Sequence, residues 1–181
     1  QSVGEGVTHL NPGDRVAYAG PIGSYAHERI IAADSLVVVP EGIDDKTAAG
    51  MMLKGMTAQY LLRQTYQVGP GTTLLFHAAA GGVGLIAGQW AAHLGATVIG
   101  TAGSPEKIEL AKAHGYQHMI TYRSEDFVER VKEITDGNGC DVVYDSVGND
   151  TYPGSLDCLK PRGLWASFGQ SSVPITDFQL A

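Results

Sequence analysis

The sequence predicts an α/β fold in which a parallel β-sheet carries helices on both faces. From Thr72 onward, short apolar runs alternate with stretches of helical periodicity, which is the pattern of βαβ units. The runs are hydrophobic at consecutive positions, as is typical of strands buried on both faces. A glycine-rich turn separates the first of these strands from the first helix. These observations indicate a Rossmann-type, doubly wound parallel sheet, preceded by a shorter β-rich segment.

The β-rich segment occupies the first forty or so residues. Its predicted strands cover residues 15–18, 24–31 and 36–39, with a turn over residues 21–23. Such a segment is too short to bury a core of its own, so we expect it to be the edge of a larger structure.

A helix is predicted over residues 44–67, where Asp44 or Asp45 can cap the first turn. Gly50 and Gly55 interrupt its apolar spacing, and a glycine inside a helix is unfavourable. We therefore expect a kinked helix or one in two parts.

The alternating elements begin at residue 73. Strands are predicted over residues 73–77, 97–101, 118–121, 140–144 and 163–168. Helices are predicted over residues 83–94, 105–114, 127–135 and 150–159. Pro105 suits the first turn of its helix, because that position needs no backbone donor.

Length and composition limit the possible functions. The chain has 181 residues, of which 44% are hydrophobic and 17% charged, enough for one sizeable core. The net charge of −7 opposes binding to the nucleic acid backbone. Cys140 and Cys158 are too distant in sequence for a C-x-x-C motif and exclude a disulfide framework. We expect no membrane segment, since no apolar run reaches a spanning length, and we interpret the start without methionine as that of an excised fragment.

The motif that indicates chemistry is the turn after the first strand of the sheet. Ala79, Gly81 and Gly84 occupy the three small-residue positions of a G-x-G-x-x-G fingerprint. Gly81 would let the backbone approach a pyrophosphate, and the free N–H groups at the start of the helix would bind its charge. The alternative is a tight turn that binds nothing. The repeated βα units favour a dinucleotide site.

The end of the next strand distinguishes between the two nicotinamide dinucleotides. An NAD site usually places an acid there to bind the ribose 2′-hydroxyl, but residues 100–103 contain none. Ser104 can donate a hydrogen bond to a 2′-phosphate, and Lys107 supplies a matching charge one helical turn later. Tyr122 and Arg123 could flank the adenosine. These residues favour NADP, with Glu106 as the one residue nearby that opposes a phosphate.

Other chemistries find less support. No G-x-S-x-G, P-loop or Tyr-x-x-x-Lys motif occurs, which opposes hydrolase, nucleotidase and short-chain dehydrogenase functions. Asp141 and Asp145 could form an acid pair, but they flank a buried strand, and we favour a structural role. We also interpret His77 as a packed histidine rather than a proton shuttle. His114 and His118 are interpreted as surface residues rather than metal ligands.

Residues 78–84, residues 100–104 with Lys107, and residues 145–148 resemble the medium-chain dehydrogenase/reductase superfamily. They are most similar to its zinc-free, zeta-crystallin-like NADPH:quinone oxidoreductases, and the resemblance extends from Gly13 to Gly169. It implies two domains: a partial GroES-like catalytic domain over residues 1–43, and an NADPH-binding Rossmann domain over residues 44–181, truncated at its C-terminal end.

The resemblance implies a set of cofactor-binding residues. Gly82 and Val83 would lie on the pyrophosphate, and Gly103, Ser104 and Lys107 around the 2′-phosphate. Tyr122 would lie beside the adenosine. The remaining positions would line the nicotinamide side of the site: Thr57, Tyr60, Ser146, Val147, Phe168 and Gly169. No residue is implied as catalytic.

The resemblance also implies the activity: hydride transfer from NADPH to a quinone, without zinc. Zinc-dependent relatives have a cysteine ligand just before the position of Gly55, where this chain has Lys54, and an ammonium group binds no zinc. An alkenal, enone or enoyl-thioester reductase is an alternative, and an NADPH sensor or single-strand RNA-binding protein is an alternative of another class. We expect a cytoplasmic homodimer with a quinone substrate, no membrane and no nucleic acid partner, and no activity from this fragment alone.

Overall fold

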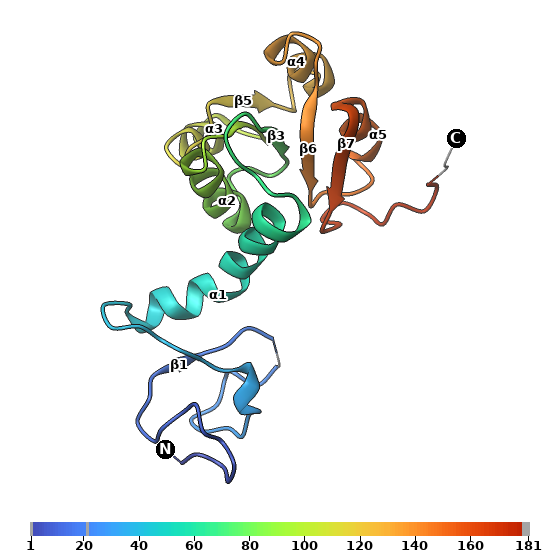
Figure 1. Ribbon diagram of the computed structural model, residues 1–181. Helices are drawn as coiled ribbons and strands as arrows, with labels where there is room; N and C mark the ends of the chain where they lie inside the picture. Colours follow the sequence, from blue (N-terminus) through green and yellow to red (C-terminus); the bar gives the residue numbers. More distant parts are fainter. Residues whose placement is uncertain (1, 21, 179–181) are drawn as a thin grey trace. The chain divides into compact units, whose positions relative to one another are not determined.

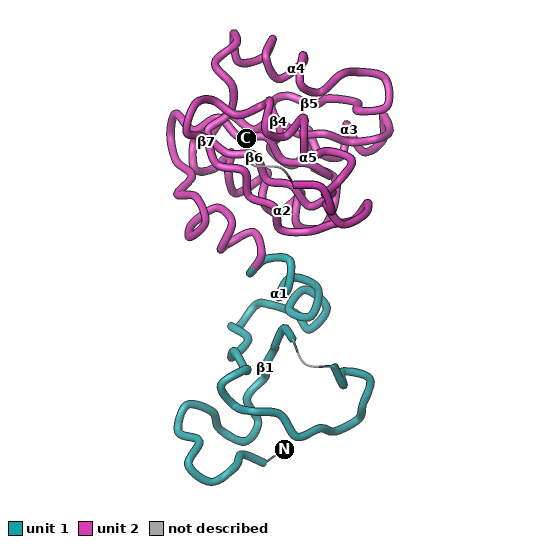
Figure 2. Tube along the Cα trace, turned by 90° about the vertical axis from the view of Figure 1, so that its right-hand side faces the viewer, with its two compact units in different colours: residues 1–56 teal, residues 57–181 magenta. Residues whose placement is uncertain are grey.

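The computed structural model describes residues 2–20 and 22–178, so Gln1, Pro21 of the predicted turn and residues 179–181 of the predicted second domain lie outside the described residues. The chain divides into two compact units, Gln1–Met56 and Thr57–Ala181 (Figure 2). Helix α1 (Asp45–Tyr60) begins in the first unit and ends in the second. The two units are described separately below.

The first unit contains little regular structure before α1. Strands β1 (Val16–Ala17) and β2 (Val37–Val38) pair antiparallel, and a short helical turn, η1 (Ala33–Ser35), precedes β2. Asp44 caps α1 by accepting hydrogen bonds from the backbone N–H groups of Lys46 and Thr47 at 2.9 and 3.0 Å.

The prediction of a strand over residues 24–31 is wrong, because the structure has only bends and irregular backbone there. Tyr25 and Ile30 are fully exposed in this unit. A run of β-formers becomes a strand only where a partner strand and a buried face are available, and neither is offered to these residues within the unit.

The second unit is built on a five-stranded parallel sheet, as predicted (Figure 1). Its strand order is β5-β4-β3-β6-β7. The strands are β3 (Thr73–Phe76), β4 (Thr97–Ala102), β5 (His118–Thr121), β6 (Cys140–Asp145) and β7 (Leu159–Ser167). The order reverses between β3 and β6, since the chain runs outward to β5 on one side of β3 and to β7 on the other.

Two apolar cores lie on opposite faces of this sheet. Leu74 and Phe76 of β3 pack with α2 (Gly82–His93) and α3 (Pro105–Lys112), while Leu75 between them packs with α4 (Phe127–Ile134) and the end of α5 (Tyr152–Asp157). The alternation follows from the strand period of two. Both faces are therefore covered, which explains why the strands are apolar at consecutive positions (Figure 1).

Three element boundaries differ from the sequence-based expectations. Helix α1 continues through Gly50 and Gly55 without a break, and the irregularity comes later, as a π-helical turn, η2 (Leu61–Thr65). Leu61 and Leu62 of this turn are buried in the core, so tertiary packing rather than glycine content places the irregularity. Helix α5 is shorter than expected and β7 starts earlier, because its pairing with β6 begins at Leu159.

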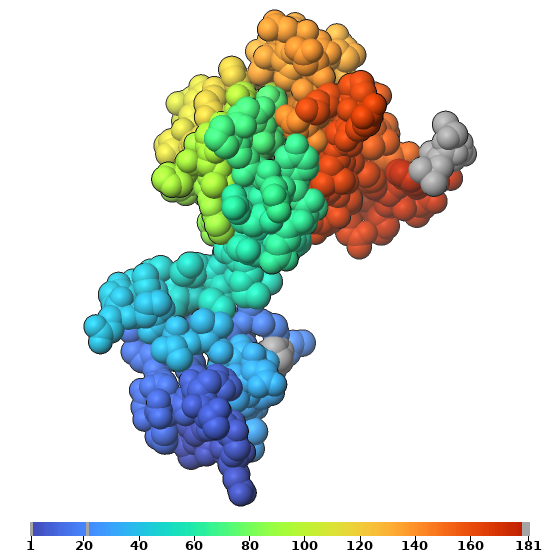
Figure 3. All heavy atoms as spheres, viewed as in Figure 1, coloured from blue at the N-terminus to red at the C-terminus, as the bar shows by residue number. Residues whose placement is uncertain are grey.

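The chain after β7 returns to the surface of the second unit. Phe178 stacks on Trp165 at 6.1 Å between ring centroids and lies 5.4 Å from Tyr152, so residues of β7, α5 and the last described segment share one surface (Figure 3). Within residues 2–20 and 22–178, every helix falls short of the length and apolar character needed to cross a membrane.

Candidate functional site

A pocket of about 420 Å³ opens at the carboxyl edge of the sheet, where the strand order reverses. Ligands of open α/β sheets bind in such crevices. Every lining residue belongs to the second unit, and they come from the segments that follow all five strands. They are His77, Ala78, Ala80, Gly81, Thr101, Ala102, Gly103, Lys107, Tyr122, Phe127, Val147, Asp150, Thr151 and Ser171.

The turn between β3 and α2 forms one wall of the pocket. Ala78 adopts a left-handed conformation with φ of 55°, and the turn is held by hydrogen bonds from Ala79 N to Thr101 O and from Gly81 N to Ala78 O, at 3.0 and 2.8 Å. A Cβ atom on Gly84 would lie 2.5 Å from the carbonyl oxygen of Ala79. Helix α2 therefore packs directly on the turn, and its N-terminal N–H groups lie beside the pocket.

The ends of β4 and β5 meet at a second wall. A Cβ atom on Gly103 would lie 2.4 Å from the Tyr122 hydroxyl and 3.3 Å from Arg123 Nε, so these two side chains pack closely on Gly103 and would have to shift for a larger residue. Lys107 lines the pocket from the first turn of α3. Ser104 caps α3 by accepting from Lys107 N at 3.4 Å. Its hydroxyl also hydrogen-bonds the exposed Glu106 and thereby lowers the pKa of that carboxyl.

A buried polar chain lies beneath the pocket. The ring nitrogens of His77 are each 3.1 Å from a hydroxyl oxygen, Nδ1 from Thr101 and Nε2 from Ser155. The ring also packs edge-on against Phe127, with ring centroids 5.1 Å apart. Burial lowers the pKa of His77 from 6.5 to about 4, although Asp145 opposes this shift. His77 is therefore neutral at neutral pH and is packed, as the sequence analysis favoured, although it also borders the pocket.

Asp145 is the fully buried end of this polar chain. Burial tends to raise the pKa of its carboxyl, but the hydrogen bonds it accepts hold that pKa below its ordinary value. Its donors are Ser155 Oγ, Thr151 Oγ1, Val147 N, Gly148 N and Trp165 Nε1. Both backbone donors, Val147 N and Gly148 N, belong to the loop that lines the pocket after β6, so Asp145 shapes that loop.

The structure brings only some of the expected cofactor-binding residues to the pocket surface. Four line it: Gly103, Lys107, Tyr122 and Val147. Three are chain neighbours of lining residues: Gly82, Ser104 and Ser146. Val83 follows Gly82 in the first turn of α2, and Gly169 lies against Ser146, whose carbonyl oxygen would be 3.0 Å from an added Cβ. Phe168 packs on Phe76 at 5.6 Å between ring centroids. Thr57 and Tyr60 lie on α1 and are not among the lining residues.

Several lining residues could not be predicted from the sequence. Thr101 lies in an apolar strand and Phe127 at the start of a helix. Nothing in the sequence around either residue distinguishes it from a core position. Asp150 and Thr151 follow residues 145–148 directly, so their place after a strand end was the available signal. Ser171 reaches the pocket because Ser171 N donates to Ser146 O at 3.0 Å, a long-range contact.

The described residues offer no metal-binding cluster of three or more His, Cys, Asp or Glu side chains. Cys140 and Cys158 are buried in the core, and burial raises the pKa of each thiol to about 12. Zinc binds cysteine as the thiolate and needs a tetrahedral set of thiolate, imidazole or carboxylate ligands, and these two buried thiols do not supply one.

Comparison with known proteins gives consistent matches. A family profile described as zinc-binding dehydrogenase matches residues 82–181. A quinone oxidoreductase from Pseudomonas aeruginosa is 56% identical over 181 residues, 99% of this chain and 56% of that protein. A 2-haloacrylate reductase from Burkholderia is 54% identical over 95% of this chain and 53% of that protein. The chain thus spans about half the length of these relatives.

A solved structure matches the fold closely. The crystal structure of Escherichia coli quinone oxidoreductase complexed with NADPH matches with a TM-score of 0.94 at 52% identity, over 98% of this chain and 55% of that chain. The resemblance seen in residues 78–84, 100–104 and 145–148 is thereby confirmed. The chain belongs to the zinc-binding dehydrogenase family, within the medium-chain dehydrogenase/reductase superfamily.

Proposed function

We propose that the whole protein is an NADPH-dependent quinone oxidoreductase and that this chain binds its cofactor. The observation that carries the proposal is the pocket at the reversal of strand order, which Gly81, Tyr122 and Lys107 line together. It combines a close backbone approach, an aromatic ring and a cation, which suit a pyrophosphate, an adenosine and a 2′-phosphate. Relatives that are named quinone oxidoreductases, one solved with NADPH, support the same conclusion.

The residues of the second unit fit the phosphate groups of NADPH. Gly82 and Val83 start α2, whose free N–H groups would bind the pyrophosphate, and Gly84 leaves no Cβ between helix and turn. Lys107, with Gly103 and Ser104, would hold the 2′-phosphate, since the end of β4 carries no competing acid. Ser104 would have to exchange its hydrogen bond with Glu106 for one with the phosphate.

The nicotinamide side of the site is assigned by resemblance to Thr57, Tyr60, Ser146, Val147, Phe168 and Gly169. When bound, NADPH supplies the hydride for the acceptor. The role of the chain is to orient the ring and exclude water, and the loop after β6 suits this role because Asp145 holds it from below.

We further propose that the reaction proceeds without zinc and that the whole protein is a cytoplasmic homodimer. Residues 1–43 would belong to its catalytic domain and residues 44–181 to its NADPH-binding domain. Lys54, at the position where zinc-dependent relatives have a cysteine, is exposed on α1 and offers an ammonium group rather than a ligand.

The proposal is tested by following the oxidation of NADPH by 1,4-benzoquinone in the presence of the whole protein. A parallel assay uses NADH in place of NADPH. We expect quinone-dependent turnover and a preference for NADPH. Cofactor binding without turnover on any acceptor would instead indicate an NADPH sensor and contradict the enzymatic proposal.

A reductase of activated C=C bonds is the second candidate, because the 2-haloacrylate reductase is nearly as similar to this chain as the quinone oxidoreductase. The same assay distinguishes the two when an enone and a 2-haloacrylate are added to the panel. A kcat/KM at least tenfold higher for the alkenes than for quinones would select the second candidate.

Lys107→Ala is expected to weaken NADPH binding about tenfold and to leave NADH binding unchanged. A charge-assisted contact contributes about 1.5–3 kcal/mol, and solvent exposure of Lys107 places the loss at the lower end. Calorimetric titration with both cofactors measures it. Lys112→Ala is the matched control, since Lys112 lies on the same helix but pairs with Glu109 at 2.9 Å. Equal losses for NADPH and NADH would mean that Lys107 acts through folding.

A further inference from the structure

The pocket is lined by groups of opposite charge that come from opposite sides of β3. Lys107 and Tyr122 follow β4 and β5, whereas Asp150 and Thr151 follow β6. Two strand spacings, roughly 10 Å, separate β4 from β6. The 2′-oxygen and the exocyclic amino group of an adenosine likewise lie at opposite ends of that nucleoside. The pocket therefore offers a cation to one end of such a ligand and a carboxylate to the other.

The carboxylate of Asp150 is unused by the protein. Among residues 2–20 and 22–178 it has no hydrogen-bond or ion-pair partner, although it lines the pocket. The buried Asp145, which is ionised because five donors stabilise its charge, adds a second negative group on the same side. His77 between the two sides is neutral and cancels neither charge. A phosphate is therefore disfavoured at this end, and a hydrogen-bond donor is favoured.

The backbone holds Asp150 in place before any ligand arrives. Asp150 N donates to Ser172 Oγ at 3.4 Å, and the neighbouring Asn149 N donates to Val173 O at 3.3 Å. On its other side the loop is held by hydrogen bonds to Asp145. A side chain on a loop that is fixed from both sides can discriminate between a hydrogen-bond donor and an acceptor on the ligand. The reason is that binding costs little conformational entropy when the loop is already ordered.

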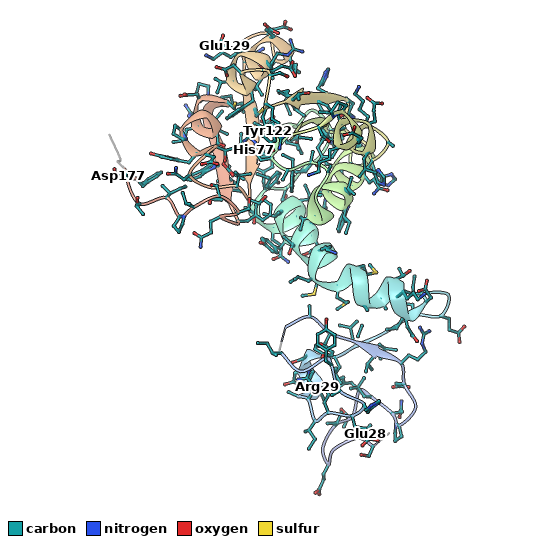
Figure 4. The ribbon with its side chains drawn as sticks, turned by 180° about the vertical axis from the view of Figure 1, so that it is seen from behind. Glu28, Arg29, His77, Tyr122, Glu129 and Asp177 are labelled. Atoms are coloured by element: carbon teal, nitrogen blue, oxygen red, sulfur yellow. The ribbon has the colours of Figure 1, made fainter. Side chains whose placement is uncertain are left out.

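We infer that Asp150 is the residue that selects the base of the dinucleotide, by accepting a hydrogen bond from the exocyclic amino group of adenine. This rests on the proposed function. An ionised carboxylate can only accept hydrogen bonds, so it suits the amino group of adenine and repels the carbonyl oxygen that hypoxanthine carries at the same ring position. Tyr122 and Phe127 line the same pocket and supply aromatic surface for a flat base; Tyr122 is labelled in Figure 4.

The test compares the equilibrium binding of NADPH with that of its reduced hypoxanthine analogue, which lacks the amino group. The 181-residue chain should bind NADPH about tenfold more tightly than the analogue. Asp150→Asn should reduce this ratio to about one, because an amide can turn its NH₂ group toward the carbonyl oxygen of hypoxanthine. Asp150→Ala should also reduce the ratio, by removing the repulsion as well as the hydrogen bond.

The ratio itself controls for folding, since a structural defect weakens both cofactors alike. Asp177→Asn is the matched control: Asp177 is an exposed carboxylate that Figure 4 shows well apart from His77 and Tyr122, and its ratio should stay at the wild-type value. A wild-type chain without preference, or an Asp150→Asn ratio equal to wild type, would overturn the inference while leaving the proposed function intact. Failure of the wild-type chain to bind either cofactor would overturn both.

Discussion

Gly84→Ala is expected to lower the free energy of unfolding of the second unit by about 3 kcal/mol, the upper end of the usual cost of overpacking. The added Cβ would lie 2.5 Å from Ala79 O and 2.7 Å from Ala78 O. Neither side can yield: the turn is held by backbone hydrogen bonds, and Gly84 O accepts from the Tyr116 hydroxyl at 2.8 Å. The helix propensity gained from alanine, about 1 kcal/mol, is smaller than this cost.

Chemical denaturation followed by tryptophan fluorescence measures this loss. The two tryptophans of the chain, Trp90 and Trp165, both lie in the second unit, so the signal reports that unit. Gly69→Ala is the control, because a Cβ there meets nothing within 4 Å. It should leave stability unchanged or raise it by about 0.4–1 kcal/mol. Unchanged stability of Gly84→Ala would mean that α2 does not rest on the turn as the structure has it.

The second unit is also expected to lose about 3 kcal/mol of stability as the pH falls from 6.5 to 4, because of His77 alone. In the folded chain His77 stays neutral down to a pKa of about 4, because it is buried. In the unfolded chain the same side chain takes up a proton near pH 6.5. The unfolded state therefore binds more protons than the folded state throughout this window. Acidification stabilises the unfolded state relative to the folded state by up to about 1.4 kcal/mol per pH unit. Above pH 6.5 the contribution is complete.

The groups that face His77 leave the upper part of this window to the histidine. Thr101, Ser155 and Phe127 do not titrate there, and Asp145, whose pKa is lowered in the folded chain, adds its own loss of stability only toward the acidic end, where the unfolded carboxyl begins to take up a proton.

His77→Gln should flatten the dependence of unfolding free energy on pH between 6.5 and 4, even though it costs stability at pH 7. His118→Gln is the control, since His118 is exposed on β5, and it should keep the wild-type slope. Denaturation curves at several pH values give both slopes. A wild-type slope in His77→Gln would contradict the assignment.

Much of the second unit could be predicted because its signals are local. Strands β3 and β6 are apolar at consecutive positions, and Pro105 with Ser104 marks the start of α3 in both sequence and structure. The same reasoning went wrong over residues 24–31, where β-forming side chains find no partner within the first unit. It also misplaced the irregularity of the first helix, because buried Leu61 and Leu62, rather than Gly50 and Gly55, decide where the helix changes.

For the site, the glycine turn, the lack of an acid at the end of β4 and the position of Lys107 could be inferred from the sequence, since each belongs to one stretch of chain around a strand end. That His77, Thr101, Ser155 and Asp145 form one buried chain, and that Asp150 lines the same pocket as Lys107, became apparent from the tertiary structure alone. The reason is physical. These residues lie on, or follow, strands that are close together in the sheet but distant in sequence, and the reversal of strand order, not any local pattern, brings the strand ends to one edge.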